Sequence, residues 1–383
     1  MGLFKKNDPF YDISKLWNYG CTYSMAFGQK GNGKTYQGLK KILELYTSTW
    51  DTGKRTGVYM RRNGVDFVQG RAERITAGLV RDHLPEKMTD GYYTDIYYKG
   101  KRYYLCRYEE NKKGEQERIC DEKPFLYAFD LTSSVHDSSG DFPDVGIIHF
   151  DEFMSRTGYL KDEWETFRIA ESTIIRDKQD VRILMTGNTL NLYNCPYFDE
   201  MGLTRIPEQK QGTIDLYTYG DSDTSVAVEY TGHRKTEAAN KYFAFGRKDV
   251  DMVTKGSWDI RMYPHLPIDT RIRPKDIIMS FYIEYKDILL QGDIIVKDDD
   301  SYIYIHPKTT PLQRNAGDII YSTSGIIIGN IVPSWIYGVR PIDKLITKYF
   351  NTGKVCYSSN SVGEIVMGFL DWSNRNRQQQ RSR

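Results

Sequence analysis

The sequence predicts an α/β chain in which a mostly parallel sheet with helices on both faces precedes a smaller α+β domain. Up to about residue 220, short apolar runs alternate with stretches of helical periodicity, which is the pattern of strand–helix–strand units. From residue 277, three apolar runs follow one another across acidic or glycine turns, as in an antiparallel meander. A chain of 383 residues also exceeds one ordinary core, so two domains are expected.

Composition narrows the class of protein. With 39% hydrophobic and 27% charged residues, the chain should fold as a globular protein. The net charge is only +2, so any contact with nucleic acid must come from local basic patches. Five scattered cysteines without a CxxC pair argue against a zinc site or a disulfide framework and fit a reducing cytosol. No run of 18 apolar residues or signal-peptide pattern occurs, so we expect no membrane or secretory role.

The first segment that carries chemistry follows the apolar run Tyr23–Phe27, which predicts a strand, and matches GxxxxGK[ST] at every fixed position. It consists of Gly28, Gln29, Lys30, Gly31, Asn32, Gly33, Lys34 and Thr35. Apolar residues then recur at i, i+3, i+4 and i+7 from Leu39, which predicts a helix. Glycines let backbone N–H groups approach phosphates, and the start of the helix favours negative charge. We therefore predict a phosphate loop, with Lys34 on the β- and γ-phosphates and the Thr35 hydroxyl on Mg²⁺.

Two further elements follow the predicted helix. The segment GVYMRR predicts a strand that ends near Arg61 and Arg62. Residues 95–129 read as an insertion, because polar and apolar residues alternate around a charged turn that contains glycine. This alternation predicts a hairpin.

The segment GIIHFDE, residues 146–152, predicts a buried strand that ends in two adjacent carboxylates. An acid at the carboxyl end of a parallel strand faces the same crevice as the phosphate loop. Asp151 can then hold the hydration shell of Mg²⁺, and Glu152 can polarise the attacking water. A glutamate after the aspartate favours ATP-hydrolysing motors over small-molecule kinases or GTPase switches. The sequence also lacks a guanine-reading NKxD-like motif, which again favours ATP.

The segment VRILMTGN predicts another strand, and its polar end offers Thr186 or Asn188 as a sensor of the γ-phosphate. Between the acid pair and this strand the sequence places four arginines, namely Arg156, Arg168, Arg176 and Arg182. Any one of them could be an arginine finger that reaches the ATP of a neighbouring subunit. Their spacing does not choose among them.

The sequence predicts three regions. Residues 1–220 should form the ATPase domain, residues 221–268 a polar connector with short helices, and residues 269–383 a C-terminal domain. In the last region, two later apolar runs predict a final strand and a closing helix. The chain ends in SNRNRQQQRSR, with four arginines and no acid, which is typical of a solvated basic tail.

Several segments, taken in order, resemble one family. They are GQKGNGKT, VYMRR, KGKRYY, PDVGIIHFDEF, TIIRDKQDVRILMTGN and NCPYFDE. Together they are similar to the DNA-packaging ATPase of phi29-like tailed phages, over most of residues 15–200. The resemblance implies a P-loop ATPase of the additional-strand, conserved-glutamate class that acts as a homo-oligomeric ring, expected to be a pentamer. Such a ring works in the host cytoplasm, docked at the portal of a preformed capsid, and drives double-stranded DNA inward.

The resemblance also implies roles for single residues. Arg176 aligns with the family's arginine finger and should act in trans, and Arg61 and Arg62 match a basic pair near the nucleotide or the subunit interface. Basic residues of the predicted hairpin, Lys99 among them, are candidates for contact with DNA. In the best-known relatives a packaging RNA joins the motor to the portal, which makes RNA a candidate partner.

For the C-terminal domain the resemblance implies an RNase H-type fold, expected to be a vestigial nuclease that binds nucleic acid or the portal. A two-metal nuclease needs clustered carboxylates at strand ends. Here Glu284 lies near the end of the first strand, and Asp298, Asp299 and Asp300 lie in a predicted turn. Two alternatives stay open. One is an active nuclease that depends on Glu284 or Asp293, and the other is a non-motor ATP-binding assembly factor.

Overall fold

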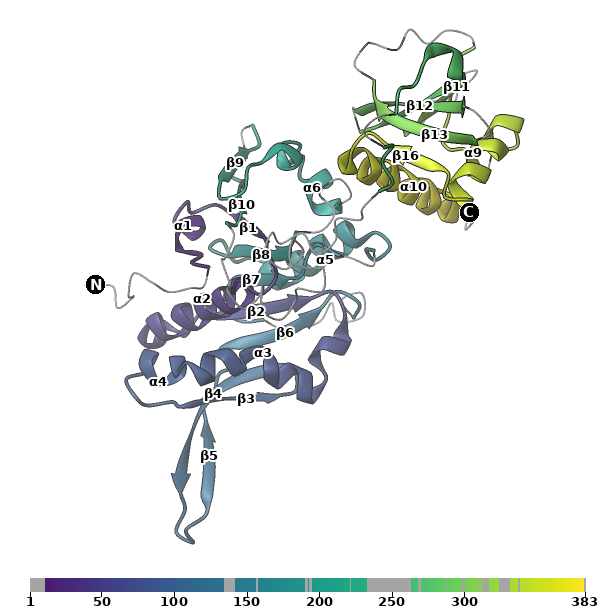
Figure 1. Cartoon of the computed structure of the whole chain (residues 1–383). Helices are drawn as coiled ribbons and strands as arrows, with labels where there is room; N and C mark the ends of the chain where they lie inside the picture. The colour runs from purple at the N-terminus through teal and green to yellow at the C-terminus, as the bar shows by residue number, and fades with distance from the viewer. Residues whose placement is uncertain are drawn as a thin grey trace. The chain divides into compact units, whose positions relative to one another are not determined.

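The chain divides into two units, Met1–Asp259 and Ile260–Arg383, in the computed structural model (Figure 1). The structure describes residues 11–133, 142–155, 158–189, 192, 195–220, 222–232, 263–267, 270–286, 288–297, 300–308, 310, 312, 317–323, 331–336 and 338–381, the side chains of 375–381 excepted. Most of the predicted connector therefore lies outside the described residues, as do Arg156, Asp298 and Asp299.

Ten strands, counted over the described residues, form the sheet of the first unit in the order β3-β4-β6-β2-β7-β8-β1-β10-β9, with β5 paired to β4. Their bounds are β1 (Tyr23–Gly28), β2 (Thr56–Arg61), β3 (Asp95–Lys99), β4 (Arg102–Glu110), β5 (Gln116–Cys120), β6 (Leu126–Asp130), β7 (Val145–Asp151), β8 (Arg182–Asn188), β9 (Ile214–Thr218) and β10 (Ser225–Tyr230). From β6 to β10 all neighbours are parallel, whereas β9 and the β3–β5 segment pair antiparallel. The predicted mostly parallel sheet is confirmed.

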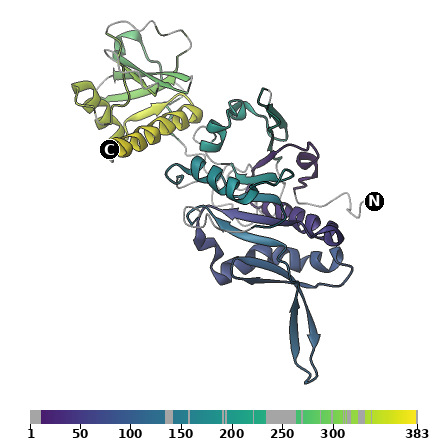
Figure 2. The same cartoon turned by 180° about the vertical axis from the view of Figure 1, so that it is seen from behind.

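Helices cover both faces of this sheet, as predicted (Figures 1 and 2). They are α1 (Ser14–Trp17), α2 (Lys34–Ser48), α3 (Gln69–Arg81), α4 (Leu84–Met88), α5 (Glu163–Ile175) and α6 (Pro196–Glu200), with short 3₁₀ turns η1 (Trp50–Thr52), η2 (Gly64–Phe67) and η3 (Ile206–Glu208). Apolar side chains of α2 and α3 share one buried cluster with Tyr59, whereas those of α5 and α6 share another with Val58 and Met60. Since successive residues of a strand point to opposite faces, the two clusters lie on opposite sides of the sheet.

The insertion forms two hairpins where the sequence predicted one. In the first, Lys99 pairs with Arg102 across a tight turn between β3 and β4. The second joins β4 to β5, and the Asn111 side chain accepts the backbone N–H groups of Lys113 and Glu115 at its tip. This turn around Asn111 reverses the chain within the charged segment of the insertion that contains glycine. The β4–β5 ribbon projects from the edge of the sheet (Figures 1 and 2).

The predicted boundary of the first domain at residue 220 is wrong. Residues 225–230, assigned to the connector, form β10 and pair in parallel with β1 along its length. The segment SVAVEY alternates small and apolar residues, and its central three residues, Val226 to Val228, are buried. Its partner lies some 200 residues earlier in the chain, so local composition does not indicate the pairing.

The second unit contains a sheet in the order β15-β14-β11-β12-β13-β16. Its elements are η4 (Pro274–Asp276), β11 (Ile277–Tyr285), β12 (Ile288–Lys297), β13 (Asp300–Pro307), β14 (Ile320–Ser322), β15 (Ile331–Val332), α9 (Pro341–Asn351), β16 (Val355–Tyr357) and α10 (Asn360–Arg381). The first three strands are antiparallel, while β14 and β15 add in parallel beside β11. This arrangement fits the expected RNase H-type domain.

The elements α9 and β16 of this unit escaped prediction, and the apolar run predicted as one final strand contains two strands, β14 and β15. The closing helix was predicted, and α10 continues through the basic tail to Arg381. Trp335 is buried between aromatic rings of the sheet and of the helices, Phe281 and Phe369 among them. Over the described part of the chain, no helix is both long and apolar enough to cross a membrane.

Candidate functional site

The predicted phosphate loop connects β1 to α2, with the last residue of β1 and the first residue of α2 at its two ends. Gly31 and Gly33 have φ angles of 75° and 101°, which ordinary side chains rarely adopt. At Gly28 a methyl group would lie 1.9 Å from the Thr231 hydroxyl oxygen, so the close approach of these two segments requires glycine there. Lys30 and Gly31 lie exposed at the surface of the loop.

Lys34 is buried at the start of α2 and points back into the loop. Its ammonium donates to the carbonyl oxygens of Gln29, at 2.7 Å, and Gly28, at 3.3 Å, and to the Asn32 side-chain oxygen at 3.1 Å. The Asn32 amide in turn donates to the Thr231 hydroxyl, at 3.0 Å. Burial lowers the pKa of Lys34 to about 8. A desolvated cation among backbone dipoles is well placed for a phosphate group, whose charge would restore its ordinary pKa.

Asp151, at the end of β7, lies against the start of α2. The Thr35 hydroxyl donates to its Oδ2 at 2.9 Å, and so does the Tyr59 hydroxyl at 2.7 Å. The Thr186 hydroxyl donates to Oδ1 at 2.5 Å, and Arg61 Nη1 lies 3.2 Å from Oδ2. Burial alone would raise the pKa of Asp151, but the neighbouring charges and hydroxyl groups outweigh it and lower that pKa. The carboxylate therefore stays ionised.

Glu152 follows Asp151 in a left-handed backbone conformation, with φ at 58°. Its carboxylate is about half exposed, at 54%, and its Oε2 lies 3.1 Å from Arg61 Nη1. One guanidinium nitrogen of Arg61 thus contacts both acids. Backbone strain of this kind at a non-glycine residue concentrates at functional sites. In this arrangement the carboxylate lies beside the phosphate-loop crevice and is paired with a cation.

The strand β8 separates β7 from β1, so the two chemistry-bearing strands are not neighbours. This interposed strand is what the predicted ATPase class requires. Of the two sensor candidates, Thr186 lies opposite Asp151 and Asn188 lies opposite Gly28 in the strand ladders. Asn188 thus lies beside the start of the phosphate loop, while the Thr186 hydroxyl donates to the Asp151 carboxylate.

The three arginine candidates among the described residues have different surroundings in the structure. Arg168 pairs with Glu171 on the same helix. Arg182 stacks on Trp17, 3.6 Å from the ring centre, and donates to its backbone oxygen at 2.7 Å. Arg176 follows the last residue of α5, with φ at 46° and ψ at −116°, and is exposed, as Arg168 also is. Arg176 therefore lies at a surface that a second subunit could approach.

Arg62 is a supporting residue whose role sequence reasoning did not resolve. Its side chain forms a paired contact with the buried Glu163, with both N···O distances at 2.8 Å. It also donates to the backbone oxygens of Glu152, at 3.1 Å, and Phe153, at 2.7 Å. The Tyr197 hydroxyl adds a bond to Glu163 at 2.7 Å. Arg62 therefore holds the backbone of the loop that carries Glu152.

Two residues of the site were missed altogether, Tyr59 and His149. Each is a polar side chain within an apolar run, and each precedes a recognised site residue, Arg61 or Asp151, by two positions. That spacing puts the side chains on the same face of their strands, which was the available signal. His149 Nε2 lies 2.8 Å from the Thr186 hydroxyl oxygen, and its ring meets that of Tyr59 edge to face.

The predicted basic residues of the first hairpin lie at the β3–β4 turn. Lys101 binds Asp130 at the end of β6, with an N···O distance of 3.1 Å, whereas Lys99 and Arg102 are exposed. In the second unit, Glu284 accepts a hydrogen bond from the Ser322 hydroxyl. Asp293 accepts one from the Ser280 hydroxyl and lies 3.0 Å from His306 Nε2. No group of three or more possible metal ligands was found among the described side chains.

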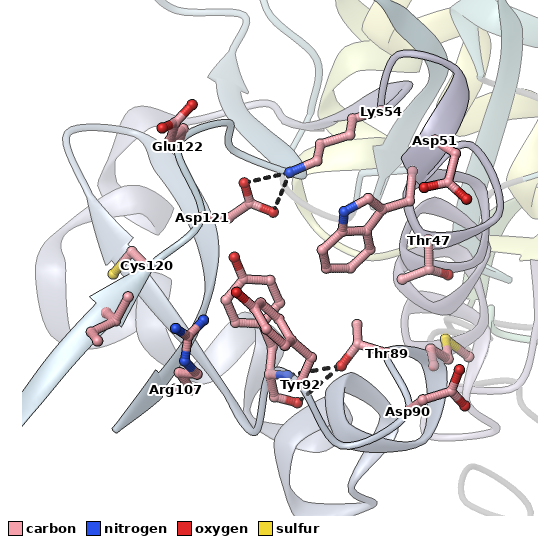
Figure 3. A pocket seen from close by; sticks show the side chains of 14 residues that line it. Thr47, Asp51, Lys54, Thr89, Asp90, Tyr92, Arg107, Cys120, Asp121 and Glu122 are labelled. Carbon is pink, nitrogen blue, oxygen red and sulfur yellow. Dashed lines mark hydrogen bonds and ion pairs between the residues drawn. The ribbon is translucent and has the colours of Figure 1, made fainter. Parts of the chain in front are cut away.

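A hollow of about 670 Å³ lies beyond the last turn of α2, at the base of the β4–β5 hairpin (Figure 3). Trp50 and Tyr93 stack in its wall with ring centres 5.5 Å apart. Lys54 binds both carboxylate oxygens of Asp121, at 2.7 and 2.9 Å, and Arg107 binds Glu109. Lys54 and Arg107 are thus paired within the protein, and none of the predicted site residues lines this hollow.

No family model and no curated protein sequence matches the chain. Two solved structures resemble it over nearly its whole length. The phi-28 gp11 DNA packaging motor is 17% identical, with a TM-score of 0.51 over 96% of this chain and 97% of its own. The bacteriophage phi-29 viral genome packaging motor assembly is 17% identical, with a TM-score of 0.50 over 96% of this chain and 100% of its own. The chain shares its fold with these structures across both units.

Proposed function

We propose that the chain is an ATPase that drives double-stranded viral DNA into a preformed capsid. The observation that carries the proposal is the convergence of the phosphate loop, Asp151 and Glu152 across the interposed strand β8, with the Thr35 hydroxyl 2.9 Å from Asp151. The likeness to two packaging-motor structures over nearly the whole chain supports DNA packaging as the process that the ATPase drives. At 17% identity that likeness concerns the fold, so the function remains our inference.

The site fits ATP and Mg²⁺. The Thr35 hydroxyl and the ionised Asp151 offer hard oxygen ligands 2.9 Å apart, which suit Mg²⁺, and glycines free the loop N–H groups for phosphate. When bound, Mg²⁺ neutralises charge that develops on the phosphates. Lys34 would hold the β- and γ-phosphates, and Asn188, opposite Gly28 in the strand ladder, would sense the γ-phosphate. Glu152 polarises the attacking water once its carboxylate leaves Arg61.

The proposed active unit is a homo-oligomeric ring, expected to be a pentamer, in which Arg176 completes the neighbour's site. Its exposure at the end of α5 supports this, since such a finger must reach out of its own subunit. Partners proposed from the family resemblance are the portal protein, double-stranded DNA and, as a candidate, a packaging RNA. The place of action is the portal vertex of a capsid in the host cytoplasm.

The decisive experiment measures ATP turnover against oligomeric state, with and without double-stranded DNA. We expect turnover that rises with DNA, falls with salt because the contacts are to phosphates, and drops about 100-fold or more in Lys34→Ala. Binding of ATP without DNA-stimulated turnover at any protein concentration would instead make the chain an assembly factor. Mn²⁺-dependent DNA cleavage lost in Asp293→Ala would point to an active nuclease.

Action in trans has its own test. A ring that mixes Arg176→Ala and Glu152→Gln chains contains interfaces where an intact Glu152 meets an intact Arg176. We expect each variant alone to be inactive and mixtures to recover turnover with a maximum near equal proportions. If no mixing ratio restores activity while both variants still assemble, Arg176 does not act in the neighbour's site.

A further inference from the structure

His149 is a buried imidazole inside the strand that carries Asp151. It is fully enclosed, and the residues around it come from three other elements: α2, β2 and β8. Its Nε2 lies 2.8 Å from the Thr186 hydroxyl oxygen, and the Thr186 hydroxyl lies 2.5 Å from Asp151 Oδ1. The three side chains therefore form a hydrogen-bonded chain that ends on the proposed metal-side carboxylate.

The direction of this chain follows from counting hydrogens. A threonine hydroxyl has one hydrogen, and an ionised carboxylate can only accept, so the hydrogen of Thr186 points to Asp151. The contact between His149 and Thr186 then requires that Nε2 carry the hydrogen and donate it. Nδ1 of His149 is left as an acceptor, and this atom is buried without a partner among the described residues. Buried polar atoms without partners are rare and call for an explanation.

The imidazole is also wedged against the helix that starts with Lys34 and Thr35. A methyl group at Gly38 of α2 would lie 2.3 Å from the ring, so the helix backbone packs directly on it. The ring of Tyr59 also meets the imidazole edge to face, with ring centres 5.3 Å apart. The same Tyr59 donates its hydroxyl to Asp151 Oδ2. The ring thus touches every element that places a group on Asp151.

We propose that His149 is a positioning residue for the metal side of the site: its Nε2–H orients the Thr186 hydroxyl, which fixes Asp151 Oδ1 and leaves Oδ2 facing Thr35. The inference rests on the proposed ATPase function and deepens it. The hydrogen bonds of this relay lead to the Asp151 carboxylate, and the ring meets α2 at Gly38, about one turn beyond Lys34. The relay should therefore affect metal binding and leave contacts to the nucleotide unchanged.

The test compares two amides at the same position. In His149→Gln the side-chain N–H group can occupy the place of Nε2, whereas in His149→Asn the amide is too short to reach Thr186. We would measure Mn²⁺ affinity by electron paramagnetic resonance in the presence of a non-hydrolysable ATP analogue, using the full-length chain. The Asn variant should bind Mn²⁺ about 10-fold more weakly, as is typical for a lost partner of a metal ligand, and the Gln variant should remain within about 3-fold. Analogue affinity in EDTA should be the same in all three proteins.

Thr186→Val keeps the side-chain volume and removes the hydroxyl, so it tests the relay without disturbing the imidazole pocket. It should weaken Mn²⁺ binding at least as much as His149→Asn, and the double variant should be no weaker than Thr186→Val alone. Additive losses, or equal losses in the Gln and Asn variants, would overturn the proposal in favour of a packing role. Because the readout is metal binding, it stands apart from turnover, and a wild-type chain that binds Mn²⁺ and the analogue without hydrolysis contradicts only the proposed function.

Discussion

Replacing Gly38 by alanine should destabilise the first unit even though it improves the helix. Gly38 lies within α2, where alanine is intrinsically favoured by about 1 kcal/mol. Its new methyl group would, however, lie 2.3, 2.5 and 2.8 Å from three atoms of the His149 ring, well inside normal contact. The ring also meets Tyr59 edge to face and is bonded to Thr186, so it has little room to move.

The size of the effect follows from these terms. Overpacking of a well-filled core costs about 1–3 kcal/mol, and a buried hydrogen bond broken by a shifted ring costs about 1–3 kcal/mol more. After the helix-propensity gain of about 1 kcal/mol, we expect a net loss of about 1–5 kcal/mol in the free energy of unfolding. Urea unfolding followed by tryptophan fluorescence would measure it. Gly78→Ala in α3 is the matched control, since its methyl group would lie no closer than 3.3 Å to any neighbour, the partly exposed ring of Tyr36.

A second background separates the clash from any other defect of the helix. In a His149→Val chain the ring atoms that the methyl group meets are absent. The same Gly38→Ala change should then stabilise the protein by about 1 kcal/mol, the helix-propensity gain alone. If Gly38→Ala is stabilising in the wild-type background, or equally destabilising in both, the close packing of α2 on His149 is not what requires glycine here.

Arg62→Ala should cost about 3–5 kcal/mol in the free energy of unfolding, because it leaves the buried Glu163 carboxylate without its cation; a loss below about 1 kcal/mol in urea unfolding would refute this. Glu152→Gln should keep ATP affinity in equilibrium binding and abolish turnover, and residual turnover above about 1% would exclude Glu152 as the group that polarises water. In the second unit, the hydrogen bond between His306 and Asp293 raises the pKa of His306. Burial alone would raise the pKa of Asp293, but hydrogen bonds from His306 and other donors lower it. The stabilisation from this pair should be complete between about pH 4 and 6.5. It should fade as the pH rises through the raised pKa of His306 or falls through the lowered pKa of Asp293, and it should vanish in His306→Asn. Hydrogen exchange of β12 amides, compared with the variant at each pH, should show protection that decreases from pH 6 to 8 only in the wild type.

The phosphate loop and the acid pair could be predicted because their signals are local. Glycines at Gly31 and Gly33 mark a backbone that needs positive φ, and an apolar strand that ends in Asp151 and Glu152 marks the opposite side of the crevice. Both patterns lie within about ten residues of sequence. The alternation of strands and helices likewise fixes a parallel sheet, since crossover connections allow few other arrangements.

The partners of these residues could not be predicted, because they depend on strand register. Tyr59 lies opposite His149, and Asp151 lies opposite Thr186, through ladders that join segments 35 to 92 residues apart in the sequence. A shift of one residue in either ladder would turn these side chains to the other face. The same reason explains β10, whose six residues read as loop until their pairing with β1 is known.

Arg61 and Arg62 illustrate how one sequence feature divides into two physical roles. As the last residue of β2 and the one after it, they point to opposite sides of the chain. Arg61 lies between the two carboxylates, and its charge lowers the pKa of Asp151, whereas Arg62 binds the backbone oxygen of Glu152 and the buried Glu163. Arg62 thus binds the backbone at the left-handed residue Glu152, while Arg61 binds the Glu152 carboxylate. In the proposed mechanism, the Glu152 carboxylate leaves Arg61 while Arg62 still binds the backbone of its loop.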